Sequence, residues 1–403
     1  MNARRRAALV GALMLLTTSA CGVPFDPYWR VEKFRVLGVK SDPLTVRPGE
    51  VATISALAAS PSDDAITYAW DWCPFQTLAQ NEYECPFTRD ELATLLTAQI
   101  PEEQREQLPP GFDIGALLPE FDLGSEPEAQ FTYPGGDASL ALFFCQLSES
   151  LLSAQNDALG GQVGVSECDE GFNVTVRLIA SSGGERIIAA KQLQLWTGND
   201  VFANQNPDVQ DVQIRLKDVA DEAKCADDLP WLSESDDERW YTLPDGAVTP
   251  LVAGVPFELR SLVDPALVED YRRKIPFGSE DTNGDGLTDP IPESVTYRWF
   301  VSEGDVGDSE KLYKEGVSPQ SLPDASIVEF SISYDPEPTD PQFPEQQDDW
   351  DRDGTPNSSD PCPWVTNETS DACETRVWSV VRDGRLGMDW IERRFSVARF
   401  IDK

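Results

Sequence analysis

The side chains with the clearest capacity for chemistry are oxygen donors that recur at fixed spacing in two short acidic loops. The first loop spans residues 281–289 and places donors at loop positions 1, 3, 5 and 9. These are Asp281, Asn283, Asp285 and Asp289. Gly286 stands at position 6, where a loop wrapped around an ion must turn sharply. Carboxylates this close repel one another unless a cation lies between them, so the loop predicts a calcium site. Position 12, where such loops carry a bidentate glutamate, holds Pro292, and Glu293 is the candidate substitute.

The second acidic loop, residues 349–363, has the same spacing and ends in Cys-Pro. Its candidate ligands are Asp349, Asp351, Asp353, Asn357 and Asp360. With Gly354 at position 6, the loop resembles a thrombospondin type 3 repeat, although Asn357 stands where the repeat has aspartate. The resemblance implies bound calcium and a bracing disulfide. We expect a structural cation at both loops, and a solvated acidic turn is the alternative.

Composition restricts the reactions that the chain can support. There is no histidine among 403 residues, which excludes Ser-His-Asp and Cys-His catalysis and any histidine-ligated metal. With 71 acidic residues, a close pair of carboxylates carries little information, so no pair stands out as a hydrolase site. The net charge of −39 opposes phosphate backbones, and we expect no nucleic-acid partner. We expect a protein that is not an enzyme.

The eight cysteines predict disulfides in an oxidising compartment. If Cys21 is modified as described below, seven remain, which gives three pairs and one leftover thiol. Pairing of neighbours along the chain gives Cys73–Cys85, Cys145–Cys168 and Cys362–Cys373, with Cys225 unpaired. The alternative is that some of these cysteines stay reduced and buried.

The N-terminal segment has the pattern of an export signal. Arg4-Arg5-Arg6 precede an apolar run from Ala7 to Leu16, which is too short to span a bilayer. Small residues then lead to Cys21, and the segment resembles a bacterial lipoprotein signal, although Thr18 stands where that family prefers leucine. The resemblance implies cleavage before Cys21 and lipid chains on its thiol. Because Gly22 follows, it also implies transport to the outer membrane, on either its periplasmic or its surface-exposed face. The alternative is an ordinary signal peptide cut near Ala20.

Short alternating strands between turn residues predict a mainly β chain built of two immunoglobulin-like sandwiches. The pattern Thr-Tyr-x-Trp occurs twice, ending at Trp70 and at Trp299, and each tryptophan is expected in a core. Each half also closes with two long strands: 173–180 with 186–196, and 376–382 with 389–400. The predicted organisation is a signal peptide (1–20), a lipidated tether (21–31), module 1 (32–198), a linker (199–207) and module 2 (208–403).

Both modules carry predicted insertions. In module 1 the insertion covers about 73–165, and Thr88 to Glu91 has the spacing of a helix capping box. Residues 139–154 form an apolar run that suits either a strand or a second helix. In module 2 the acidic insertions cover about 264–293 and 335–373. The whole arrangement resembles the immunoglobulin-like surface lipoproteins of delta-proteobacteria of the myxobacterial type.

These observations favour a membrane-anchored envelope lipoprotein that presents calcium-stabilised modules for adhesion or for binding a protein or glycan partner. The first alternative is a carbohydrate-binding surface protein that uses exposed tryptophans. The candidates are Trp231, Trp240, Trp350 and Trp364. The weaker alternative is a carboxylate-based hydrolase.

Overall fold

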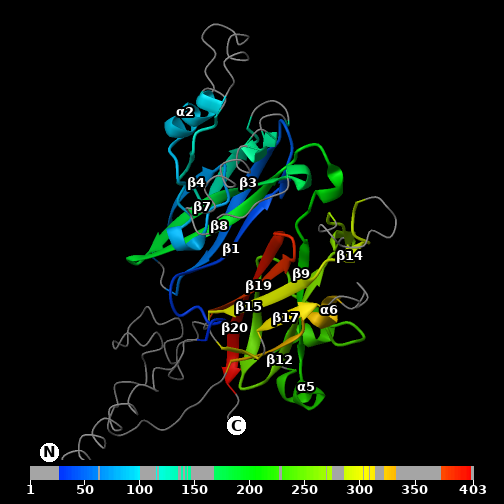
Figure 1. Cartoon of the computed structure of the whole chain (residues 1–403). Helices are drawn as coiled ribbons and strands as arrows, with labels where there is room; N and C mark the ends of the chain where they lie inside the picture. The colour runs from blue at the N-terminus through cyan, green and yellow to red at the C-terminus, as the bar shows by residue number, and fades with distance from the viewer. Residues whose placement is uncertain are drawn as a thin grey trace, which may run out of the picture.

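The structure of the chain is a computed structural model. The described residues are 27–61, 64–99, 115, 118–134, 138, 141–142, 144–146, 168–226, 229–268, 270–274, 286–302, 304–307, 309–313, 322–332 and 374–400. Strands dominate them, and they form two β-sandwich modules stacked along the molecule (Figure 1).

Module 1 consists of a three-stranded and a five-stranded sheet. The first sheet has the order β1 (Arg35–Asp42), β3 (Val51–Ala59) and β6 (Glu128–Thr132). The second has the order β2 (Thr45–Val46), β8 (Glu185–Leu195), β7 (Phe172–Ser182), β4 (Thr67–Cys73) and β5 (Asp122–Gly124). Their inward side chains form one core, with Ile54, Phe131, Val176 and Leu178 almost fully buried.

Module 2 repeats this topology with two five-stranded sheets. One has the order β10 (Tyr241–Thr242), β9 (Val209–Leu216), β12 (Phe257–Val263), β18 (Val328–Ser331) and β16 (Asp305–Gly307). The other has the order β11 (Val248–Ala253), β20 (Met388–Phe400), β19 (Glu374–Asp383), β15 (Val295–Val301) and β17 (Glu310–Tyr313). A separate pair, β13 (Asp270–Tyr271) and β14 (Ile291–Pro292), projects from it.

The strand orders of the two modules correspond, except that β10 and β16, at the edges of one sheet of module 2, have no counterpart in module 1. In each one, a short early strand runs parallel to the last strand, as β2 does with β8 and β11 does with β20. The last two strands form the long antiparallel hairpins that the sequence predicts, β7 with β8 and β19 with β20. Both modules are immunoglobulin-like, because an early strand pairs parallel with the last one and the remaining strands follow a shared order.

The repeated tryptophans fill equivalent positions, as predicted. Trp70 on β4 and Trp299 on β15 are buried, because the period of two in each strand turns both rings inward. Each indole N–H finds a backbone acceptor: Trp70 donates to the carbonyl of Glu126 at 2.8 Å, and Trp299 to that of Ser326 at 3.0 Å. Burial with the polar atom satisfied is the arrangement that a core tryptophan needs.

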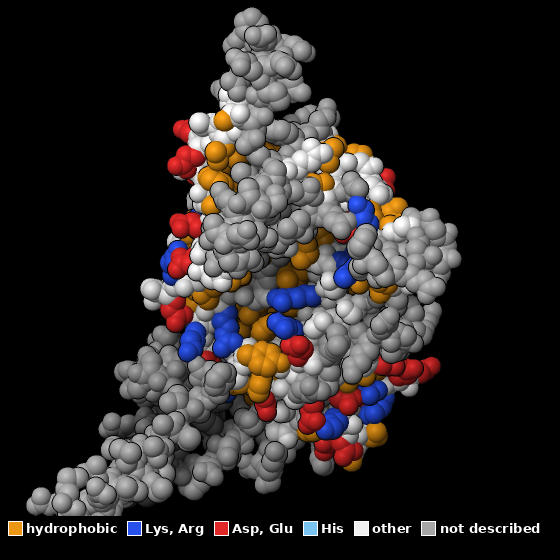
Figure 2. Space-filling view, in the orientation of Figure 1, with side chains coloured by type: hydrophobic (Ala, Val, Ile, Leu, Met, Phe, Trp, Pro, Cys, Tyr) orange, Lys and Arg blue, Asp and Glu red, His pale blue; other side chains and the backbone are white. Residues whose placement is uncertain are grey.

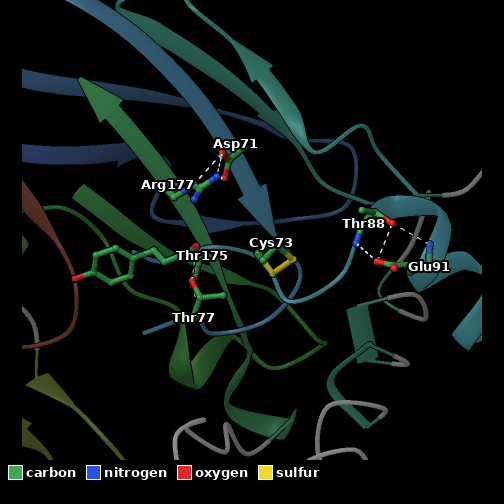
Figure 3. Close-up of a disulfide and its surroundings, with 9 residues drawn as sticks. Asp71, Cys73, Thr77, Thr88, Glu91, Thr175 and Arg177 are labelled. Carbon is green, nitrogen blue, oxygen red and sulfur yellow. Dashed lines mark hydrogen bonds and ion pairs between the residues drawn. A yellow bond between two sulfur atoms is a disulfide. The ribbon is translucent and has the colours of Figure 1, made fainter. Parts of the chain in front are cut away.

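The insertion of module 1 contains the predicted helix, α2 (Arg89–Gln99). Thr88 and Glu91 form the capping box: the backbone N–H of Thr88 donates to the Glu91 carboxylate at 2.9 Å, and the N–H of Glu91 donates to Oγ1 of Thr88 at 3.3 Å (Figure 3). Leu92 and Leu96, one turn apart, are buried against the core of module 1. Within 139–154, residues 141–142 and 144–146 are helical, and the other residues of this run lie outside the described ones.

Two predicted disulfides, Cys73–Cys85 and Cys145–Cys168, join this insertion to the sandwich, and Cys225 is buried as a thiol that forms no disulfide in the structure. Cys73 ends β4, next to a bidentate pair in which Arg177 on β7 contacts Asp71 on β4 (Figure 3). Their shortest contact, Nη2 to Oδ2, is 2.7 Å. The disulfide and the cross-strand pair therefore hold the root of the insertion. Cys362 and Cys373 lie outside the described residues.

The predicted tether is shorter than 21–31, because residues 28–31 belong to the folded body. The backbone N–H of Val31 donates to the carbonyl of Val301 at 2.9 Å, and the N–H of Val301 donates to that of Trp29, also at 2.9 Å. Ser309 donates to the phenol of Tyr28 at 2.8 Å. This docked segment, Tyr28–Val31, thus lies on module 2 before the chain enters module 1. The prediction that it forms part of a tether is wrong, because its backbone pairs with the end of β15.

Replacing Thr88 by alanine removes the capping oxygen from α2. We expect Thr88→Ala to lower the free energy of unfolding by about 1 kcal/mol, measured by urea denaturation, because an N–H of the first turn loses its acceptor. Thr94→Ala is the matched control: Thr94 is exposed within the same helix and bonds only the Asp90 carbonyl. Equal losses for the two variants would contradict a capping role.

Candidate functional site

The two modules meet through an apolar contact on the outer face of the sheet formed by β15, β19 and β20. Leu37 and Ala59 of module 1 and Val31 of the docked segment pack there with Phe300, Trp378 and Val380. Gly38 allows the close approach: a Cβ at that position would lie 2.7 Å from the sulfur of Met388. Side chains from three parts of the chain therefore exclude water from one continuous surface.

The linker, residues 199–207, lies at the centre of this junction and bonds to both modules. Asn204 donates from Nδ2 to Oδ2 of Asp383 at 3.1 Å and to the carbonyl of Arg385 at 2.9 Å. Asn206 donates to the carbonyl of Ser41 in module 1 at 2.6 Å and accepts from the backbone N–H of Met388 in module 2 at 3.1 Å. Each amide thus fixes the linker to module 2 through the turn between β19 and β20, and Asn206 also reaches module 1.

A buried ion pair stands behind the linker. Arg385 donates from Nη1 to the Glu293 carboxylate at 3.1 Å, where Glu293 is 1% exposed and Arg385 13%. The second guanidinium nitrogen of Arg385 donates to the carbonyls of Phe202 and Ala203, at 3.1 and 3.0 Å. A charge this deeply buried is tolerated only with a partner and additional hydrogen bonds, and both are present.

Glu293, the substitute calcium ligand that the sequence suggests, has its carboxylate buried in the junction, where it contacts Arg385. Of the other candidates in the first loop, the structure describes Asp289, which is exposed. Asp281, Asn283, Asp285 and all five candidates of the second loop lie outside the described residues. Within the described part of the chain, no group of three or more Cys, Asp or Glu side chains converges as a metal site would.

The structure does describe the stem that carries the first loop. Strands β13 and β14 pair antiparallel, with Tyr271 opposite Ile291. Beyond them, the backbone N–H of Thr288 donates to the carbonyl of Arg273 at 2.8 Å, and the N–H of Arg273 donates to Oγ1 of Thr288 at 3.0 Å. Gly286 at the end of the loop has φ = 75°, the left-handed conformation that favours glycine. The stem joins the loop directly to Glu293 and the junction.

Lys191 on β8 is the second charged side chain that enters the junction. It is 5% exposed, and its ammonium donates to the carbonyl of Leu386 in the turn between β19 and β20. Burial lowers the pKa of Lys191 from 10.5 to about 8, with nearby Asp383 opposing the shift and Arg382 adding to it. Near the surface of the same junction, Lys40 pairs with Asp389 at 2.7 Å.

Two cavities open around the linker. The larger, about 950 Å³, lies between β1, the linker and module 2, and its lining has charges of both signs, including Lys40, Asp42 and Asp389. The smaller, about 300 Å³, lies between the end of β8, the linker and the β13–β14 stem. Figure 2 shows Lys and Arg side chains gathered in the hollow between the two modules, whereas acidic side chains line the outer edges of this face. Such polar cavities suit binding of a small polar molecule.

Two of the tryptophans expected to be exposed are in fact buried. Trp231 is 3% exposed, because it stacks on Tyr241 with ring centroids 5.5 Å apart. Trp240 is 2% exposed, because the guanidinium carbons of Arg215 and Arg260 each lie 4.2 Å from its ring centre. The prediction that these two rings stack on carbohydrate is therefore wrong. Trp350, Trp364 and the lipid-attachment residue Cys21 lie outside the described residues.

The junction residues that the sequence did not indicate are Lys191, Asn204, Tyr271 and Arg385. Arg385 stands in an ordinary hairpin turn, and Asn204 in a segment that has the composition of a spacer. No spacing in the sequence links these four positions, because they come from four elements that only the packing of the two modules brings together.

Comparison with known proteins places the chain in no family: no family model and no curated protein matches it. Among solved structures, it is similar at 9% identity to three N-terminal domains of the bacteriophage RB49 highly immunogenic outer capsid protein (Hoc), over 92% of this chain and 71% of that one, with a TM-score of 0.16. A chimeric titin Z1Z2 carrying a decorin peptide matches at 10% identity (91% and 100% coverage, TM-score 0.13), and a structure titled BspA_C_WT at 7% (89% and 99%, TM-score 0.14). Scores this low carry no argument, so the fold rests on the strand topology.

The buried Lys191 makes stability depend on pH in a defined window. Its pKa is about 8 when folded and near 10.5 when unfolded, so between these values the unfolded chain binds more protons, and stability rises with pH. Relative to Lys191→Met, we expect the wild type to gain up to about 3 kcal/mol of unfolding free energy between pH 8 and 10.5. Urea denaturation across that range measures the difference. Lys33→Met, at an exposed position, should follow the wild-type curve, and parallel curves for Lys191→Met would contradict the burial argument.

Proposed function

We propose that this protein is a lipid-anchored envelope protein without enzymatic activity, which holds two rigidly joined modules close to a membrane and presents them to a partner. The observation that carries the proposal is the docked segment, Tyr28–Val31. Six residues, Gly22–Pro27, separate it from Cys21, so the body would lie within about 25 Å of the lipid chains at full extension. A lipid on Cys21 would therefore fix the distance of the folded body from the membrane as well as the compartment in which the protein resides.

Several contacts hold the docked segment on module 2. Besides its backbone pairing with Val301, the indole N–H of Trp29 donates to Asp305 at 3.2 Å, and the ring packs against the core of module 2. Val31 belongs to the apolar contact between the modules. Module 2 would consequently be the membrane-proximal module, and module 1, with α2 at its far end, the distal one (Figure 1).

Rigidity supports a role in binding. The junction combines an apolar contact, a buried ion pair and a linker bonded on both sides, so the modules have little freedom to lose when a partner binds both. The resulting surface combines a preorganised junction with polar cavities.

Among the described residues, no helix has the length and apolarity needed to span a bilayer.

We propose calcium as the structural ion of the two acidic loops, on the strength of their ligand spacing and of the described stem of the first loop. That stem delivers Tyr271 and Glu293 to the junction. An ion that orders the loop would therefore also favour the arrangement in which Glu293 meets Arg385. Extracellular calcium sites of this kind are weak, with Kd on the order of 10⁻⁴–10⁻³ M.

The anchor and the orientation are tested separately on vesicles. Mass spectrometry of the mature N-terminus should show acyl chains on Cys21, and Cys21→Ser should abolish vesicle association. For orientation, a donor dye on Gly307→Cys in module 2 or on Thr94→Cys in α2 is paired with acceptor lipids, since both positions are exposed and Cys225 is buried. We expect stronger energy transfer at position 307, because the docked segment holds module 2 near the bilayer. Equal or reversed transfer with an intact lipid would contradict the orientation alone.

Calcium should stabilise the folded chain. At a concentration roughly 10 to 100 times the Kd, we expect the unfolding free energy to exceed that in chelator by about 1.5–3 kcal/mol, because the ion binds the folded state. Calorimetric melting measures the shift. Asp285→Asn and Asp353→Asn should each reduce it, while Asp237→Asn, in an exposed turn of module 2, should leave it unchanged. Identical melting with calcium and chelator would rule out the proposed ion.

A further inference from the structure

The smaller junction cavity has the composition of a ligand site. Its volume is about 300 Å³, at the low end for small-molecule pockets. Five elements form its walls: strands β7 and β8 through Asn173 and Gln194, the linker through Asn204, the β13–β14 stem through Tyr271, and the turn between β19 and β20 through Arg385. Asp289, the one proposed calcium ligand that the structure describes, is not among its lining residues.

The charge of this cavity is opposite to that of the chain. Its lining contains Arg272, Arg273 and Arg385 against one acidic residue, Glu170, while the whole chain carries −39. The guanidinium carbons of Arg273 and Arg385 lie over the ring of Tyr271, at 5.1 and 5.0 Å from its centre. In a protein that repels anions elsewhere, this local excess of positive charge concentrates them at one position.

The arginines of the lining have different tasks. Arg385 is immobilised by Glu293, which also neutralises its charge, and by the two linker carbonyls, so it shapes the wall of the cavity. Arg273 has an exposed side chain, although its backbone is fixed on both sides by hydrogen bonds with Thr288. Arg273 is therefore a positioned cation that can still reach a ligand.

Amide groups of the same lining supply hydrogen-bond acceptors. Oδ1 of Asn173 and Oδ1 of Asn204 are both buried and have no hydrogen-bond partner in this structure. Gln194, between them, is already engaged: its amide donates to the carbonyl of Glu170 at 2.7 Å, and its oxygen accepts from Thr45 at 2.7 Å. A buried acceptor without a donor is rare in native proteins, and hydroxyl donors from a bound molecule would satisfy these two.

We propose that this cavity binds a small hydroxylated carboxylate, in the size and chemical class of a sugar acid. The carboxylate would face Arg273, the hydroxyls would donate toward the asparagine oxygens, and the apolar side of the molecule would lie against Phe202 and Tyr271. A neutral sugar offers no charge to the arginines, and an inorganic oxyanion offers no hydroxyl array. The cavity goes beyond the function proposed above, since binding here does not require the lipid anchor.

Isothermal titration of the complete mature chain carrying Cys21→Ser tests the inference, with glucuronate as the probe. We expect a Kd at or below about 1 mM, and binding of glucose and of inorganic sulfate weaker by at least about tenfold. No measurable glucuronate binding would overturn the proposal. Equal binding of sulfate or of glucose would overturn the ligand class.

Variants then locate the site. Arg273→Gln should weaken glucuronate binding at least about tenfold, because a charge-assisted hydrogen bond is lost. Its melting temperature should stay at the wild-type value, since the side chain is exposed. Arg186→Gln is the matched control: Arg186 is an exposed arginine of module 1 that pairs with Glu82, and its loss should leave binding unchanged. Equal effects of the two variants, or none from Arg273→Gln, would place the ligand elsewhere and overturn the assignment.

Discussion

The junction between the modules depends on how Arg385 is accommodated. A guanidinium removed from water carries a large desolvation penalty, which an ion pair offsets only when the remaining donors are also satisfied. Glu293 takes one nitrogen, and the carbonyls of Phe202 and Ala203 take another. Because these partners belong to the stem of the first acidic loop and to the linker, one side chain fixes both against the turn between β19 and β20.

This constraint turns the connection between two similar sandwiches into a packed interior. Asn204 and Asn206 satisfy backbone and side-chain groups of the adjoining turn, and Asn206 reaches module 1 as well. The positive side chains used here stand out in a chain with 32 basic against 71 acidic residues. The smaller junction cavity, whose lining has three arginines and one acidic residue, therefore differs in charge from the chain as a whole.

Local features were the ones that the sequence predicted well. The capping box at Thr88 and Glu91 acts within a single turn, and Cys73–Cys85 closes a loop of 12 residues, so neither depends on distant packing. Trp70 and Trp299 follow from strand alternation, which decides the face of a side chain once the strand is known. The expectation that Trp231 and Trp240 are exposed was wrong, because tertiary contacts bury both rings. Tyr241 stacks on the first, and two arginines from neighbouring strands pack on the second.

By itself, the sequence determined the class of the fold, the duplication of the module, the local disulfides and the exclusion of histidine-based chemistry, because composition and short-range periodicity set all of these. Only the tertiary structure decided that Tyr28–Val31 packs on module 2, that the linker is packed, and that Glu293 pairs with Arg385. The physical reason is that a buried charge takes whichever partner the folded chain places beside it. The oxygen spacing of the first loop predicts candidate ligands, but spacing alone does not say which carboxylate will pair with a nearby arginine.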